Sequence, residues 1–316
     1  MRITFILFLA VVFSLQSCDF TEAYFPSEEI ITPGEFNSLN DYFNFENVPK
    51  DTVWYNPVEP ITHVVPGGLT IHIEPGCCGT TPPDSIGLIV RHYPTIRRMM
   101  WGNVHTVSNE KMLVTGGAFW WTAITPENST VTVSPSSARA EVNVATNVGA
   151  YRDQMTYYRG TEQAAGNQTV LNWSQVQPAE AGFQGQSNTF VINDLQMGWT
   201  NVDALYNYSE DATTQFSVQL NNLTGAAPGE TRVFMVASEV PSLMNITNSN
   251  DGLFTTYTNS IPVGLNATLI GIAMRVDGSF LVGTLPITVA GDDQFQIDLQ
   301  PRTYQELVQI VNSVTN

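Results

Sequence analysis

The chain has 316 residues, a formal net charge of −17 from 12 Lys and Arg against 29 Asp and Glu, and 43% hydrophobic residues. At about 150 residues per domain, this length predicts about two domains, each large enough to bury a core. Lys50 and Lys111 are the only lysines, and so few cations argue against nucleic acid as a partner. The hydrophobic content is too high for wholesale disorder. The composition therefore indicates an acidic globular protein.

The first residues have the layout of an export signal. Arg2 precedes an apolar run over residues 3–13, and small polar residues follow it. This pattern predicts a signal peptide over residues 1–17 that is removed from the mature protein. The residues Leu15-Gln16-Ser17-Cys18 resemble a bacterial lipobox, which implies cleavage before Cys18 and lipidation of that cysteine. Acyl chains contribute about 0.8 kcal/mol per buried CH₂, so several of them would hold the protein permanently in a membrane. An ordinary secretory signal that carries a cysteine is the alternative.

Residues 18–60 differ in composition from the rest of the chain. Nine acidic residues face a single base, Lys50, and five prolines interrupt any regular pattern. Such a segment predicts an extended acidic tether that holds the folded part away from the lipid. Tyr42, Phe43 and Trp54 lie in its second half, and these aromatic side chains indicate that this half docks onto a domain.

After residue 60 the dominant pattern is alternation of apolar and polar side chains. Leu69, Ile71 and Ile73 follow it, and so do residues 86–90, 216–220 and 295–299. This period of two predicts strands with one face on a core and the other in water. Further β-rich runs cover residues 112–115, 118–124, 130–133, 141–146, 189–193, 231–237, 267–276 and 285–290. Many short strands with turn residues between them predict an all-β protein of sandwich type, with hairpin turns at Asp277-Gly278 and Asp292-Asp293.

One segment has helical spacing instead. Tyr304, Leu307, Val308 and Val311 recur at i, i+3, i+4 and i+7 after Pro301, which predicts a short amphipathic C-terminal helix over residues 303–314. A polar break near residues 206–213 predicts the boundary between two domains, residues 61–207 and 208–316.

The succession of a lipobox, an acidic tether and two β-rich domains is similar to that of the fimbrillin-associated surface lipoproteins of Bacteroidetes, in particular the anchor subunits of their major and minor fimbriae. The stretches that carry the resemblance are His63-Val64-Val65 with Leu69–Ile73, Asp84–Val90, Gly116–Ala123 and Asp194–Trp199. The resemblance implies two tandem β-sandwich domains of a transthyretin-like, Greek-key type with a structural role.

In that family, stalk subunits lose an N-terminal segment to a trypsin-like, often Arg-specific protease, whereas anchor subunits keep their lipid. No arginine lies between Arg2 and Arg91, and Lys50 is the only base between them. The resemblance and this absence predict a fimbrial anchor or accessory subunit, lipid-anchored through Cys18 at the outer membrane or cell surface. Its expected partners are other fimbrial subunits, which pair a β-strand with an open sheet edge.

Cys77 and Cys78 are adjacent in the sequence. Free thiols are uncommon in exported proteins, so a strained vicinal disulfide or intermolecular bonds are one interpretation, and a tight turn between two strands is the other. The four histidines, at positions 63, 72, 92 and 105, lie around this pair. The cysteine spacing does not match a metal site, so no metal and no cofactor is predicted.

The sequence contains no motif of a serine hydrolase, a zinc protease or a phosphate-binding loop, so we expect no enzymatic activity. A secreted hydrolase is the weakest alternative, because it needs a cleft with converging acids. Trp120 and Trp121 suggest a stronger one, a glycan-binding lipoprotein of an outer-membrane polysaccharide uptake system whose rings stack on sugars. Aromatic residues in a sandwich core have the same signature. On one strand these two rings point to opposite faces.

Two short stretches resemble the Asp-Ser/Thr-apolar acceptor of Bacteroidetes O-glycosylation. They are Asp51-Thr52-Val53 and Asp84-Ser85-Ile86. The resemblance implies Thr52 and Ser85 as candidate acceptors, with Thr52 favoured because it lies in the predicted tether.

Overall fold

The computed structural model describes residues 37–44, 47–79, 82–144, 146–165, 168–177, 184–186, 188–206, 212–250 and 252–315. These residues belong to one compact unit, Pro33–Asn316. Strands hold 52% of the structure and helices 13%, which confirms an all-β, sandwich-like protein. The predicted signal peptide, Cys18 and the tether up to residue 36 lie outside the described residues.

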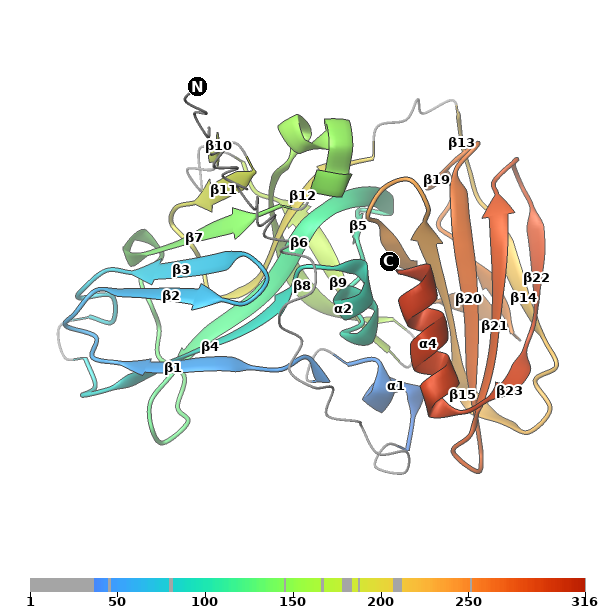
Figure 1. The fold of residues 1–316 in the computed structure, drawn as a ribbon, viewed down its shortest axis with the longest axis horizontal. Helices are drawn as coiled ribbons and strands as arrows, with labels where there is room; N and C mark the ends of the chain where they lie inside the picture. Colours follow the sequence, from blue (N-terminus) through green and yellow to red (C-terminus); the bar gives the residue numbers. More distant parts are fainter. Residues whose placement is uncertain are drawn as a thin grey trace, which may run out of the picture. The chain divides into compact units, whose positions relative to one another are not determined.

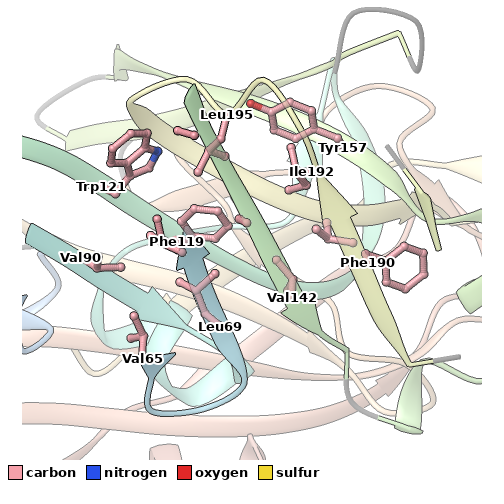
Figure 2. Packing of buried hydrophobic residues seen from close by; sticks show 14 of the residues in the cluster. Val65, Leu69, Val90, Phe119, Trp121, Val142, Tyr157, Phe190, Ile192 and Leu195 are labelled. Atoms are coloured by element: carbon pink, nitrogen blue, oxygen red, sulfur yellow. The ribbon is translucent and has the colours of Figure 1, made fainter. Parts of the chain in front are cut away.

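Two antiparallel sheets form the first sandwich (Figure 1). Sheet A has the order β1 (Asp51–Tyr55), β4 (Ile86–Tyr93), β6 (Lys111–Ile124), β12 (Gly198–Leu205), β8 (Thr156–Ala165), β9 (Gln168–Gln175), and β5 (Val107–Ser108) pairs with β6. Sheet B has the order β10 (Gln184–Gln186), β11 (Thr189–Ile192), β7 (Ala138–Asn143), β3 (Leu69–Ile73), β2 (Ile61–Val65). The core between them includes Leu69, Phe119 and Val142 (Figure 2). The alternation along β3 is thus the pattern of a strand with one face in a core.

Two further sheets form the second sandwich. Sheet C has the order β17 (Asn248–Asn250), β18 (Leu253–Thr255), β14 (Ser217–Asn221), β22 (Gln294–Asp298). Sheet D has the order β16 (Leu243–Asn245), β15 (Ala226–Ala237), β20 (Asn266–Arg275), β21 (Phe280–Thr288), β23 (Gln300–Arg302), and β13 (Thr213–Thr214) pairs separately with β19 (Ile261–Pro262). Phe216, Leu220 and Leu269 lie in the core of this sandwich.

One pairing in sheet C is parallel. β22 runs beside β14 with Phe295 opposite Val218, because the chain leaves sheet D after β21, joins sheet C as β22 and returns to sheet D as β23. The hairpin turn predicted at Asp277-Gly278 is confirmed between β20 and β21. The one predicted at Asp292-Asp293 is wrong, since β21 and β22 belong to different sheets. Alternation specifies which face of a strand is buried, and it does not specify the neighbouring strand.

Short helices complete the described part of the chain: α1 (Leu39–Tyr42), α2 (Ile96–Trp101) and α4 (Tyr304–Val314), with 3₁₀ turns η2 (Pro135–Ser137) and η3 (Thr146–Gln154). The predicted C-terminal helix is confirmed as α4. A capping box starts it: the Thr303 hydroxyl accepts from the Glu306 amide, and the Glu306 carboxylate accepts from the Thr303 amide. α4 lies against sheet D (Figure 1), and its Leu307 and Val311 are fully buried.

The outer faces of sheets A and D are apolar too. Trp173 and Trp199 on sheet A and Phe234 and Ile270 on sheet D belong to a third core cluster, which α1, α2 and α4 complete. β20 is therefore buried on both faces, as its continuous apolar run indicates. Because this cluster joins the two sandwiches, the domain boundary at residue 207 stays a prediction.

The extended tether predicted over residues 18–60 is wrong for its described part, whereas the docking predicted for its second half is confirmed. Residues 51–55 form β1 of sheet A, and Leu39, Tyr42 and Phe43 are buried in the third cluster. The physical reason is the aromatic content of this stretch, because burying such rings outweighs the preference of an acidic, proline-rich segment for solvent.

Candidate functional site

The entry segment, residues 37–44 and 47–48, is where the described chain joins the fold. Its helix α1 begins at Ser38, whose hydroxyl accepts a hydrogen bond from the Asp41 amide at 3.2 Å. The Asn47 side chain closes the other end by donating to the carbonyl of Tyr42 at 3.0 Å. A helix of four residues is too short to be stable alone, so tertiary contacts must hold it.

Phe43 lies between parts of the molecule that are distant in sequence. Its ring stacks on Trp101 of α2, with centroids 5.2 Å apart and planes 5° apart, and it also packs on Phe234 of β15 at 5.2 Å. Tyr42 meets Phe280 of β21 edge-on at 4.9 Å. Such aromatic pairs contribute roughly 0.5–1.5 kcal/mol beyond the area that they bury. The entry segment is thus held by both sandwiches.

Polar contacts fix the same segment on β15. The Leu39 amide donates to the Glu230 carboxylate at 2.5 Å, and the Arg232 guanidinium donates to the side-chain oxygen of Asn40. Burial lowers the pKa of Arg232 to about 10, and the Glu230 charge opposes this shift. A buried cation without such partners would be costly. No local pattern in the sequence marks Glu230 or Arg232, because Glu230 lies 191 positions from Leu39.

The bridge segment, residues 103–108, connects the sandwiches by hydrogen bonds. Three of its side chains donate to alternate backbone carbonyls of β9, an end strand of sheet A. The pairs are Asn103 with Thr169 at 2.8 Å, His105 with Leu171 at 2.5 Å, and Ser108 with Trp173 at 2.6 Å. These side chains occupy the place of another strand's amides, so this edge of sheet A is closed to further pairing.

Thr106 of the same segment pairs with β16, an end strand of sheet D. Its amide donates to the Leu243 carbonyl at 2.7 Å, and its hydroxyl accepts from the Leu243 amide at 2.8 Å. One segment therefore covers an edge of each sandwich. Strands β1 and β2 in the first sandwich and β22 in the second are end strands of their sheets as well, and they lie outside this bridge.

A buried carboxyl group lies on the outer face of sheet A. Asp203 on β12 is fully buried and accepts a hydrogen bond from the Asn201 side chain at 2.6 Å. Burial raises the pKa of Asp203 well above its ordinary value, and hydrogen bonds from Thr115, Gly116 and Asn201 oppose this only in part. A carboxyl group that no solvent reaches cannot act on a substrate, so its effect is on stability.

Two histidines are also buried. Burial lowers the pKa of His92 to about 4, although its hydrogen bond with the Pro66 carbonyl, at 3.0 Å, acts to raise it. Burial also lowers the pKa of His105. Both are therefore neutral near pH 7. Within the described ranges, no group of three or more His, Cys, Asp and Glu side chains could hold a metal ion.

Cys77 and Cys78 lie in the turn between β3 and β4. They are free cysteines with Sγ atoms 2.7 Å apart, so the disulfide considered for them is not formed in this structure. Adjacent Cα atoms lie only about 3.8 Å apart, closer than in unstrained disulfides. Burial raises the pKa of Cys78 to about 12, which leaves little reactive thiolate at neutral pH.

The two tryptophans considered for sugar stacking point to opposite faces of β6. Trp121 is fully buried in the core of the first sandwich, where its Nε1 donates to the Gln196 carbonyl at 2.8 Å (Figure 2). Trp120 is half-buried beneath Arg91, whose guanidinium lies 5.1 Å from the ring centroid. Stacking needs an exposed ring face, so Trp121 cannot take that role and the pair forms no platform.

Polar residues on the outer face of sheet B have the order of a hydrolase triad. The Thr62 hydroxyl lies 2.9 Å from His72 Nδ1, and His72 Nε2 lies 3.2 Å from Glu141. Thr62 and His72 are directly opposite in the β2–β3 register. They lie outside two surface pockets of the described residues, one beside Phe43 and the other beside His105. Cross-strand pairing on a solvated face explains the arrangement without catalysis.

The candidate O-glycosylation acceptors differ in accessibility. Thr52 is exposed on β1, and Ser85 is half-buried just before β4. Glycosylation at either residue stays a prediction.

Comparison with known proteins finds no matching family model and no matching curated protein. Among the described residues, none of the helices is both long and apolar enough to cross a bilayer.

The docking of the entry segment predicts the effect of Phe43→Ala. Loss of a buried ring should lower the free energy of unfolding by about 3–5 kcal/mol and release α1. The Phe43 amide, which donates to the Leu39 carbonyl at 2.9 Å, should then exchange with deuterium much faster under native conditions. Phe216→Ala is the matched control, since it removes the same ring from the second core. Equal protection of this amide in both variants would contradict the docking.

The buried carboxyl predicts a pH dependence. The pKa of Asp203 in the folded protein lies above its unfolded value of about 3.8. As the pH rises past 3.8, the unfolded chain therefore loses this proton before the folded protein does. The free energy of unfolding then falls until the pH passes the folded pKa. Asp203→Asn should therefore gain stability relative to the parent protein between pH 4 and pH 8 in denaturant unfolding. Asp153→Asn, which removes an exposed carboxylate, should show no such trend. If the stability advantage of Asp203→Asn instead grew as the pH is lowered, the raised pKa of Asp203 would be refuted.

Proposed function

We propose that the protein is a cell-surface lipoprotein that serves as an anchor or accessory subunit of a fimbrium. Acyl chains on Cys18 hold it in the outer membrane, and fimbrial subunits join it by pairing a strand with one of its sheet edges. The protein has no catalytic role in this assembly. The sequence layout and the family resemblance support the proposal, and the geometry of the entry segment carries it.

The entry segment suits a protein that is held at one end and pulled at the other. Residues 19–36 separate Cys18 from the first described residue, and a chain of this length reaches at most about 65 Å. A force on the lipid arrives at residues 37–44, where Phe43 contacts both Trp101 and Phe234. Because the entry segment contacts both sandwiches, the force is shared between them. It does not pull on the loose end of a single strand.

β2 is an end strand that fits a partner strand. Its sequence, Ile61–Val65, contains neither Lys nor Pro, the residues with which proteins protect exposed edges. Val64 is 68% exposed and offers an apolar contact to a neighbouring strand. Addition of a strand at this edge would supply backbone hydrogen bonds for affinity and side-chain contacts for specificity.

Lipid attachment is tested by Cys18→Ala. The variant should move from the membrane fraction to the medium, and the fimbriae of the cells should be shed with it, because the anchor contributes most of the membrane affinity. Gln16→Ala is the control, since it keeps the cysteine and makes the lipobox more usual. Retention of the Cys18→Ala protein in the membrane fraction would reject the proposal.

Partner pairing is tested by Val64→Lys. A lysine on the edge should disfavour strand addition, so the variant should no longer co-purify with fimbrial subunits while its stability changes by less than about 0.5 kcal/mol. Val276→Lys makes the same change at a valine that is 80% exposed elsewhere and should retain the subunits. If both variants retain them, β2 is not the pairing edge.

A further inference from the structure

Sheet A carries an exposed aromatic ring on the part of its outer face that lies outside the third cluster. Trp54 on β1 is 48% exposed, and Gly87 on β4 is directly opposite. A Cβ atom at Gly87 would lie 3.0–3.1 Å from three consecutive atoms of the six-membered ring, Cζ2, Cη2 and Cζ3. Nearly equal distances to consecutive atoms mean that the ring lies over the glycine. One ring face covers the backbone, and the other faces solvent.

The surroundings of this ring are uncharged. Ile124 on β6 lies on the far side of Gly87, and the row two residues further along the strands consists of Thr52, Ile89 and Thr122. Strands lie about 4.8 Å apart and alternate residues about 7 Å apart. Both threonine side chains are thus within roughly 12 Å of the ring, on the same face of the sheet.

Arg91 and Trp120 border this row. The Arg91 guanidinium already covers the Trp120 ring at 5.1 Å, whereas the free face of Trp54 has no such cover from a cation among the contacts of the described residues. The inner face of the Trp54 ring stabilises the sheet by covering Gly87, but its outer face contributes nothing to a core.

We infer that the sheet A patch, formed by Trp54, Gly87, Thr52, Ile89 and Thr122, binds a neutral carbohydrate chain. The apolar C–H face of a pyranose ring would stack on the free face of Trp54, and hydroxyl groups of the next sugar would meet the threonines. This binding site is separate from the fimbrial role and does not depend on it. It also differs from the Trp120 and Trp121 platform, because it uses the ring that the fold leaves exposed.

The geometry of the patch favours a neutral carbohydrate over a bilayer, an ionic ligand or a protein strand. A bilayer is usually entered by aromatic side chains that protrude, whereas Trp54 lies along the sheet. An ionic ligand would need charged groups, which the patch lacks, and the net charge of −17 disfavours acidic polysaccharides. A protein strand would pair with the edge of β1, and the patch lies on its face.

The test is native affinity electrophoresis of the intact chain in gels that contain dextran, mannan, xylan or a β-1,3-glucan. We expect at least one of these polymers to retard the protein, and Trp54→Ala to weaken that retardation at least about tenfold, the loss typical of an aromatic residue central to binding. Trp54→Phe should recover most of it, because a ring remains. Val58→Ala, at a 62% exposed neighbour, is the matched control and should behave like the parent.

The inference is overturned if no polymer retards the parent protein, or if Trp54→Ala is retarded equally. It is also overturned if the parent, and not Trp54→Ala, instead binds phosphatidylcholine vesicles, which would assign the ring to a membrane. Thermal unfolding of each variant checks that the fold is intact. Val64→Lys should leave glycan binding unchanged, so failure of the fimbrial role and failure of this inference give different results.

Discussion

Burial of the outer faces of sheets A and D is the constraint on which the rest of the structure depends. A sandwich normally buries one face of each sheet, and here sheets A and D also bury much of their outer faces. Exposure of Trp199, Phe234 and Ile270 to water would greatly lower the stability of the fold. The entry segment, α2 and α4 supply the missing cover, and each is too short to be stable without it.

The same cover determines which parts of the surface are available for function. The bridge segment occupies the edges of β9 and β16 with hydrogen bonds from side chains and from Thr106. The proposed partner strand would therefore have to pair with another end strand, such as β2. The face of sheet A is divided in a similar way, because the third cluster buries Trp173 and Trp199 while Trp54 stays in solvent. The docked entry segment, the edge of β2 and the exposed ring of Trp54 thus lie on different parts of one fold.

The spacing of apolar residues predicts a strand or helix well when that element buries a single face in a single core. The alternation in Leu69–Ile73 and the helical spacing in 304–311 each report a single buried face, and both elements form as expected. Prediction fails where a segment's partner is far away in sequence. The aromatic residues before residue 60 predict that this segment docks, but they do not predict that Tyr42 and Phe43 pack on α2, β15 and β21. The contacts of Glu230 and Arg232 with the entry segment could not be predicted for the same reason. Nor could the burial of Trp121 in the core.

By itself the sequence determined the class of fold, the terminal helix and the faces that its strands bury, because periodicity and composition are properties of neighbouring residues. Only the tertiary structure decided that β22 runs parallel to β14, where the entry segment docks, which edges the bridge segment closes, and which tryptophan faces water. Each of these depends on contacts between residues that lie scores of positions apart, and such contacts are selected by the packing of the whole chain.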